Sequence, residues 1–131
     1  MGAGYMIPLC VPEMQGNEWK YIKECLDTNW ISSAGAYVDK FEKDFKNYLK
    51  VKKSVVTSNG TTALFLALKV LGIGEGDEVI VPSLTFISPV NTIRYVGAEP
   101  VFVDVCRDTY VIDVEKIEKV ITHRHENSFT K

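Results

Sequence analysis

Ser58-Asn59-Gly60-Thr61-Thr62-Ala63-Leu64 joins a short apolar segment to an apolar helix through small polar residues. Residues 54–57 before it are mostly β-branched, a composition typical of a buried strand. Residues 63–71 after it favour a helix with almost no polar face. We therefore predict a strand, a turn and a helix that starts near Thr61 and is buried nearly all round.

This turn has the features of a phosphate-binding site. The first amides of a helix have no intrahelical acceptor, and the helix dipole places partial positive charge there. Gly60 would let an anion approach the backbone closely. An ordinary N-cap by Ser58 or Asn59 explains the same residues, so the stretch alone leaves both interpretations open.

Composition excludes several classes of protein. The chain has 131 residues, of which 46% are hydrophobic and 24% charged, as in an ordinary domain with its own core. A formal net charge of −2 provides no basic stripe for nucleic acid, and no apolar run is long enough to span a membrane. The three cysteines form no C-x-x-C pair, so we expect neither a disulfide framework nor a metal site, and a reducing cytoplasmic location.

Two amphipathic helices are predicted before residue 50. The first starts at Asn17, and the second ends at Tyr48 or Leu49; apolar side chains recur in both at helical spacing. These side chains are Trp19, Ile22 and Leu26 in the first helix and Val38, Phe41 and Phe45 in the second. The connection over residues 30–35 is predicted to be an ordered loop.

From residue 54 onward, the pattern predicts alternating strands and helices. Further strands are expected at 78–82 and 100–105, with helices from Phe86 or Ile87 to Val96 and from an Asp113 cap to Ile121. This order predicts an α/β fold with parallel strands, whose carboxyl ends form the ligand-binding edge. Phe86 follows the strand at 78–82 and is a candidate second wall of the pocket, although aromatic side chains often simply fill cores.

Several motifs follow one another in a single register from about Ile7 to Ile121. They are W-I-S-S-x-G from Trp30, the turn at 58–64, G-D-E-V-I-V-P-x-x-T-F over 76–86, Asn91, and G-A-x-P-V-F-V-D over 97–104. This succession resembles the amino-terminal part of the DegT/DnrJ/StrS aminotransferases, in particular the LegC group and the perosamine synthases. The resemblance implies a partial fold-type I large domain, with three αβα layers and parallel βαβ units, preceded by the two amphipathic helices.

The resemblance also implies a function and a set of site residues. Members of the family use pyridoxal 5′-phosphate (PLP) to transaminate nucleotide-linked 4-keto-hexoses for bacterial surface glycans, with glutamate the expected amino donor. By likeness, Gly60 and Thr61 bind the cofactor phosphate and Phe86 stacks on its ring. Trp30, Ser32 and Ser33 match a loop that contacts the sugar nucleotide, and a plain connection between helices is the alternative.

Two further positions match the family pattern. Asn91 and Asp104 are interpreted as structural hydrogen-bonding residues rather than catalytic ones. Because the family works as dimers, we expect a homodimer for a full-length form.

The sequence departs from the family toward its carboxyl end. A working aminotransferase needs a Schiff-base lysine and an acid that pairs with the pyridinium nitrogen, and we find neither, so no catalytic residue is assigned. Lys131 lacks the family spacing, and His123 and His125 are interpreted as part of a polar tail rather than as a metal site.

We therefore expect a truncated, inactive chain of poor stability. The expected divisions are residues 1–50 with the extended segment and helices, 51–122 with the partial PLP-binding unit, and 123–131 as a tail outside the family pattern. The alternative is a non-catalytic remnant that binds phosphate or a nucleotide sugar, or that serves as a dimerisation partner.

Overall fold

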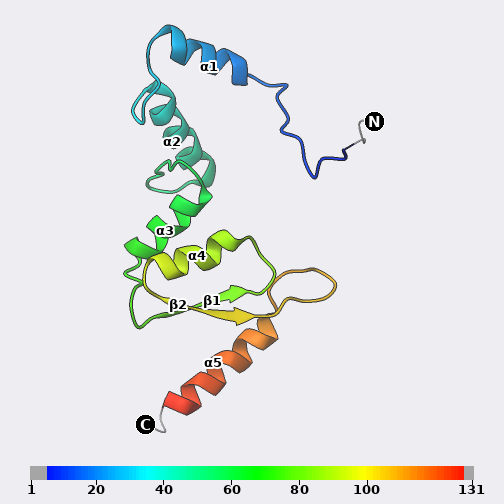
Figure 1. Cartoon of the computed structure of the whole chain (residues 1–131). Coiled ribbons are helices and arrows are strands. Elements are labelled where there is room, and N and C mark those ends of the chain that lie inside the picture. Colours follow the sequence, from blue (N-terminus) through cyan, green and yellow to red (C-terminus); the bar gives the residue numbers. More distant parts are fainter. Residues whose placement is uncertain (1–5, 129–131) are drawn as a thin grey trace. The chain divides into compact units, whose positions relative to one another are not determined.

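The computed structural model describes the backbone of residues 6–128 and the side chains of residues 6–123. The chain divides into two compact units, Met1–Val55 and Val56–Lys131, which are described separately below (Figure 1).

The first unit contains two helices, α1 (Glu18–Asp27) and α2 (Ala36–Leu49). Both predicted helices are confirmed, although Asn17 makes no side-chain capping bond. Tyr37 of α2 donates a 2.6 Å hydrogen bond from its hydroxyl to the Glu24 carboxylate of α1, and its ring lies 4.9 Å from that of Tyr21. Neither helix has a fully buried residue, so polar and aromatic contacts join them rather than a closed core.

The second unit is an α/β structure whose strands are parallel. Its elements are α3 (Gly60–Val70), β1 (Glu78–Pro82), α4 (Ile87–Tyr95), β2 (Glu99–Val103) and α5 (Val114–Ser128). The two strands pair in register from Glu78 with Glu99 to Pro82 with Val103. The predicted fold class is confirmed, with α4 as the crossover helix between parallel strands (Figure 1).

The core of this unit lies where α3 and α4 meet the sheet. Val81, Ile93, Val96 and Ala98 form a buried cluster, and Phe65 and Leu68 of α3 pack against it. Gly97 closes α4 with φ +91°, and a Cβ there would lie 3.4 Å from the Glu75 backbone, so this turn requires glycine.

Three expectations about elements need correction. Residues 54–57 are not a strand: they lie at the junction of the two units, outside the two-stranded sheet, and Val55 is 67% exposed. Helix α3 is not buried all round: Leu64 and Leu66 are each 42% exposed, because only one side of the helix packs on α4 and the core. The last helix runs on to Ser128, through residues expected to be a frayed tail.

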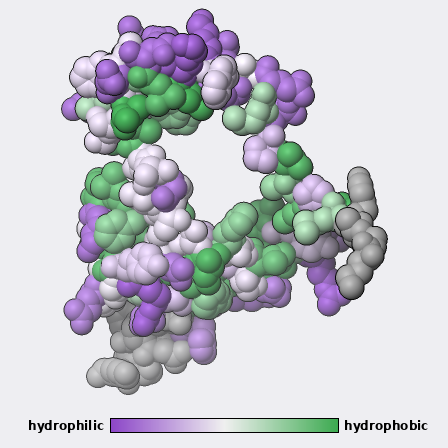
Figure 2. Space-filling model, turned by 45° about the horizontal axis from the view of Figure 1, so that its top comes forward, coloured by the Kyte–Doolittle hydropathy of each residue, from purple (hydrophilic) through white to green (hydrophobic). Residues whose placement is uncertain are grey.

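Hydrophobic side chains are also visible on the surface of the molecule (green in Figure 2). Exposed apolar side chains of the second unit include Val70 and Leu71 at the end of α3 and Phe102 on β2. Apolar surface is therefore incompletely covered among the described residues, and low stability stays a prediction.

Candidate functional site

The α3 N-terminus carries an asparagine cap. The Asn59 side-chain oxygen accepts hydrogen bonds from the Thr62 amide at 2.9 Å and the Thr62 hydroxyl at 3.1 Å. This is the N-cap that the sequence left open as an alternative. The cap satisfies only one of the unpaired amides at the start of the helix.

Gly60 and Thr61 keep their amides available at the same helix end. They are the first two residues of α3, so their amides have no acceptor within the helix, and Asn59 serves Thr62 instead. A Cβ built at Gly60 would meet nothing within 4 Å, which means that the space beside it is open. Two amides beside open space, at the positive end of a helix dipole, form a donor set that suits a phosphate group.

The start of α4 lies against the start of α3. The Thr61 hydroxyl donates a 3.0 Å hydrogen bond to the Ser88 hydroxyl oxygen, a partly buried contact between residues 27 apart in sequence. Phe86 is the N-cap residue of α4, two positions before Ser88, and is 85% exposed. Phe86 is therefore not a core residue, and its ring is open to solvent at the start of α4.

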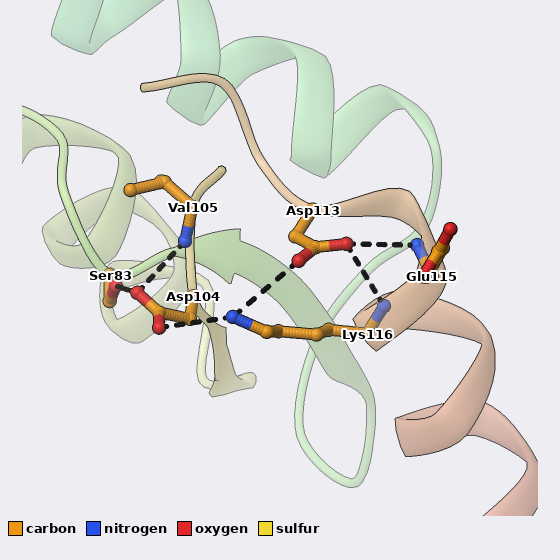
Figure 3. A network of polar contacts seen from close by, with 6 residues as sticks. All are labelled: Ser83, Asp104, Val105, Asp113, Glu115 and Lys116. Atoms are coloured by element: carbon orange, nitrogen blue, oxygen red, sulfur yellow. Dashed lines mark hydrogen bonds and ion pairs between the residues drawn. The ribbon is translucent and has the colours of Figure 1, made fainter. Parts of the chain in front are cut away.

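A polar network occupies the carboxyl edge of the sheet (Figure 3). Asp104, just after β2, accepts hydrogen bonds from the Val105 amide at 2.9 Å, the Ser83 hydroxyl at 3.3 Å and the Lys116 ammonium at 3.2 Å. Lys116 also pairs with Asp113 at 3.5 Å. The network ties the turn after β1 and the start of α5 to the end of β2.

The network also shifts the pKa values of two of its groups. The Val105 amide and then the Lys116 ammonium hold the pKa of the Asp104 carboxyl below its usual range. In turn, the hydrogen bond to Asp104 raises the pKa of Lys116. With every group of the network paired, its geometry agrees with the structural role predicted for Asp104.

The Asp113 cap is confirmed in the same region. Its carboxylate accepts from the Glu115 amide at 3.1 Å and the Lys116 amide at 3.4 Å, which satisfies amides of the first turn of α5. Asn91 is partly buried on α4, and its hydrogen-bonding role stays a prediction.

The predicted substrate residues belong to the loop between α1 and α2 of the first unit. Ser32 uses its hydroxyl locally, since it donates to the Ala34 carbonyl at 3.1 Å and accepts from the Ala34 amide at 3.2 Å. Trp30 is 57% exposed and lines an apolar groove of about 790 Å³ between the two helices, with Tyr21, Ile22, Leu26, Phe41 and Phe45. The local bonds of Ser32 favour an ordered connection, while exposed Trp30 keeps the binding interpretation open, and no bond decides the role of Ser33.

The structure thus keeps the two predicted groups of residues in different units: Trp30, Ser32 and Ser33 in the first, and Gly60, Thr61 and Phe86 in the second. Sequence reasoning missed Ser88 and Lys116. Ser88 gave a usable signal, because it follows Phe86 by two positions at the expected ligand-binding edge.

The described residues carry neither a metal-binding cluster nor a membrane-spanning helix. No group of three or more His, Cys, Asp and Glu side chains in that part of the chain could hold a metal ion. No described helix is long and apolar enough to cross a membrane. His125 and Lys131 lie outside the residues whose side chains are described.

Known proteins resemble almost the whole chain. The sequence pattern of the DegT/DnrJ/EryC1/StrS aminotransferase family matches residues 12–128. A GDP-perosamine synthase of Caulobacter vibrioides is 51% identical over 118 residues, which are 90% of this chain and 32% of that protein. The chain therefore spans about a third of the length of this curated relative.

Solved structures give the same result. A structure described as a sugar aminotransferase from Streptococcus pneumoniae, in its PLP form, has a TM-score of 0.78 and 36% identity, and covers 88% of this chain and 29% of its own. A GDP-4-keto-6-deoxymannose-3-dehydratase, with a trapped PLP–glutamate geminal diamine, has a TM-score of 0.76 and 29% identity, and covers 86% of this chain and 30% of its own. The match to the family pattern and the 51% identity establish that this chain belongs to the DegT/DnrJ/EryC1/StrS aminotransferase family.

Proposed function

We propose that this chain supplies the phosphate-binding part of a PLP site in an enzyme that transaminates a nucleotide-linked 4-keto-hexose. One observation carries the proposal: the Gly60 and Thr61 amides open the α3 helix beside unfilled space. The similarity to a sugar aminotransferase in its PLP form supports the choice of cofactor. The similarity to GDP-perosamine synthases supports a nucleotide sugar as the substrate.

Each proposed residue has a defined task. Gly60 and Thr61 hold the phosphate through backbone amides and the Thr61 hydroxyl, and Phe86 covers one face of the ring from the start of α4. When bound, the pyridine ring supplies an electron sink for transamination, which protein side chains lack. The residues of this chain bind and orient that ring, and Trp30, Ser32 and Ser33 are proposed to contact the sugar nucleotide.

Several family expectations accompany this proposal. Glutamate as amino donor, a homodimer in a full-length form, a cytoplasmic location and the inactivity of this chain alone stay predictions. So do the boundaries at residues 50 and 122 and the assignment of 123–131 to a tail outside the family pattern.

Filling the space beside Gly60 tests the cofactor site. The probe is pyridoxamine 5′-phosphate, compared with unphosphorylated pyridoxamine, because neither forms an imine with surface lysines. We expect calorimetry to show tighter binding of the phosphorylated amine, and Gly60→Val to remove that preference because its side chain occupies the open space. Far-UV circular dichroism should be unchanged, since valine is the better helix former.

Ala63→Val is the matched control. Ala63 is exposed on the same helix, one turn further along, so added bulk there should leave binding unchanged. Equal binding of the two amines by the wild-type chain, or full binding by Gly60→Val, would contradict the proposed cofactor site.

A further inference from the structure

The Thr61–Ser88 hydrogen bond joins two helices at the proposed cofactor site. It is a partly buried contact between side chains near the starts of α3 and α4, at 3.0 Å. The Asn59 side chain caps the helix through Thr62, the next residue, and not through the Thr61 hydroxyl. Ser88 is therefore the side-chain partner that the structure gives to the Thr61 hydroxyl.

Each hydroxyl in this pair can donate one hydrogen bond and accept others. In the structure the Thr61 hydroxyl donates to the Ser88 hydroxyl oxygen. If Thr61 turned its hydrogen to an anion, Ser88 could donate to the Thr61 oxygen, and the link between the helices would persist with its direction reversed. A chain of hydroxyls that ends on a charged acceptor is strengthened by polarisation.

We propose that Ser88 is a positioning residue, which holds the Thr61 hydroxyl in place to donate to the cofactor phosphate. This inference rests on the proposed function, because it assumes a phosphate at Gly60 and Thr61. It adds a residue from a second helix to that site. Ser88 acts through Thr61 and needs no contact of its own with the cofactor.

A positioning role for Ser88 has a consequence that a packing role lacks. Removing the Ser88 hydroxyl should weaken binding only through Thr61 and only for a ligand with a phosphate. A general change in how α4 packs on α3 would instead affect the phosphorylated and unphosphorylated amines alike, whatever the residue at position 61.

The test uses two variants that have the same shape and differ in the hydroxyl, Ser88→Thr and Ser88→Val. Each is made alone and together with Thr61→Val, and each is titrated with pyridoxamine 5′-phosphate and with pyridoxamine. We expect Ser88→Val to weaken binding of the phosphorylated amine about five-fold, the factor for one neutral hydrogen bond. Ser88→Thr should stay within about two-fold of the wild type, because it keeps the hydroxyl.

The Thr61→Val background completes the cycle. There, Ser88→Thr and Ser88→Val should bind pyridoxamine 5′-phosphate equally, since the hydroxyl that Ser88 positions is gone. Pyridoxamine itself should bind equally to all variants. Circular dichroism checks folding, and Ser88→Ala replaces Ser88→Val, with the same expectation, should the larger side chain prevent folding.

Three other outcomes would contradict different parts of the proposal. A wild-type preference for the phosphorylated amine that Ser88→Val leaves intact would overturn the role of Ser88 alone. Equal weakening of both amines, or an effect that persists with Thr61→Val, would show packing rather than positioning. A wild-type chain that binds both amines equally would overturn the proposed cofactor site, and the role of Ser88 with it.

Discussion

Asp104 shows how one side chain can connect several segments at the carboxyl edge of the sheet. Its carboxylate accepts from the Val105 amide, the Ser83 hydroxyl and the Lys116 ammonium, which belong to three different segments (Figure 3). The Ser83 bond connects Asp104 to the turn that leads to Phe86, the N-cap residue of α4.

The network should make stability depend on pH. The Val105 amide and Lys116 lower the pKa of Asp104 in the folded chain, so its stabilising effect is complete above the unfolded pKa. That effect is lost as the pH falls through the lower, folded pKa. We expect urea midpoints of the wild type to fall more steeply on acidification than those of Asp104→Asn.

Asp108→Asn, at an exposed loop position, is the control and should retain the wild-type pH profile. Because Asp104 is largely exposed, salt should reduce the difference between the two profiles. Parallel profiles for the wild type and Asp104→Asn would refute a role for this carboxylate in stability.

At the level of elements, periodicity predicted the helices well, whereas composition predicted the first strand wrongly. Trp19, Ile22 and Leu26 recur at helical spacing, and a helix depends mainly on its own residues, so α1 was predictable from local sequence. A strand also needs a neighbour, and the composition of residues 54–57 carries no information about whether one lies alongside.

In the candidate site, too, local features could be predicted from the sequence and contacts between distant residues could not. Gly60 and Thr61 begin α3 and Phe86 precedes α4; local sequence specifies both helix starts, so these places in the chain could be predicted, and the shared site stays a prediction. The Thr61–Ser88 bond could not, because it depends on how two helices pack across 27 positions of sequence. The Ser83–Asp104 contact, across 21 positions, was hidden for the same reason.

The contact between α1 and α2 has a measurable titration. The hydrogen bond to Glu24, followed by burial, raises the pKa of Tyr37 to about 12. Glu24→Gln removes the charged acceptor, so we expect the Tyr37 pKa to fall toward its ordinary value near 10. The difference between the near-ultraviolet titrations of the two proteins isolates this phenol from the other tyrosines.

Stability should follow with a definite sign. The pKa of Tyr37 is higher in the folded chain than in the unfolded one, so the Tyr37–Glu24 bond stabilises the fold fully below the unfolded pKa of about 10. This stabilisation is lost as the pH rises through the folded pKa of Tyr37. Asp44→Asn is the control. Asp44 pairs with Lys40 within α2, so its substitution should not alter the Tyr37 titration. An unchanged titration in Glu24→Gln would show that the two helices do not hold this contact in solution.

For the whole molecule, the main feature is how unevenly apolar side chains are covered. Val81 and Ile93 are each 3% exposed in the core of the second unit, whereas Val70 and Leu71 at the end of α3 are 78% and 74% exposed. Exposed apolar surface adds nothing to stability, but it favours association and binds hydrophobic dyes. Substitutions in the core should therefore change stability, whereas substitutions of the exposed side chains should change association.

The double variant Val70→Lys/Leu71→Gln should separate them most clearly. Because both side chains are exposed, we expect the free energy of unfolding to change by no more than about 0.5 kcal/mol. Binding of anilinonaphthalene sulfonate and the sedimentation coefficient at high protein concentration should both decrease. Ile93→Ala is the contrast, with an expected loss of about 2–4 kcal/mol, because it leaves a cavity in the core. Destabilisation by the surface variant to the same extent as Ile93→Ala would mean that the end of α3 is covered in solution, since only buried side chains carry a cost of that size.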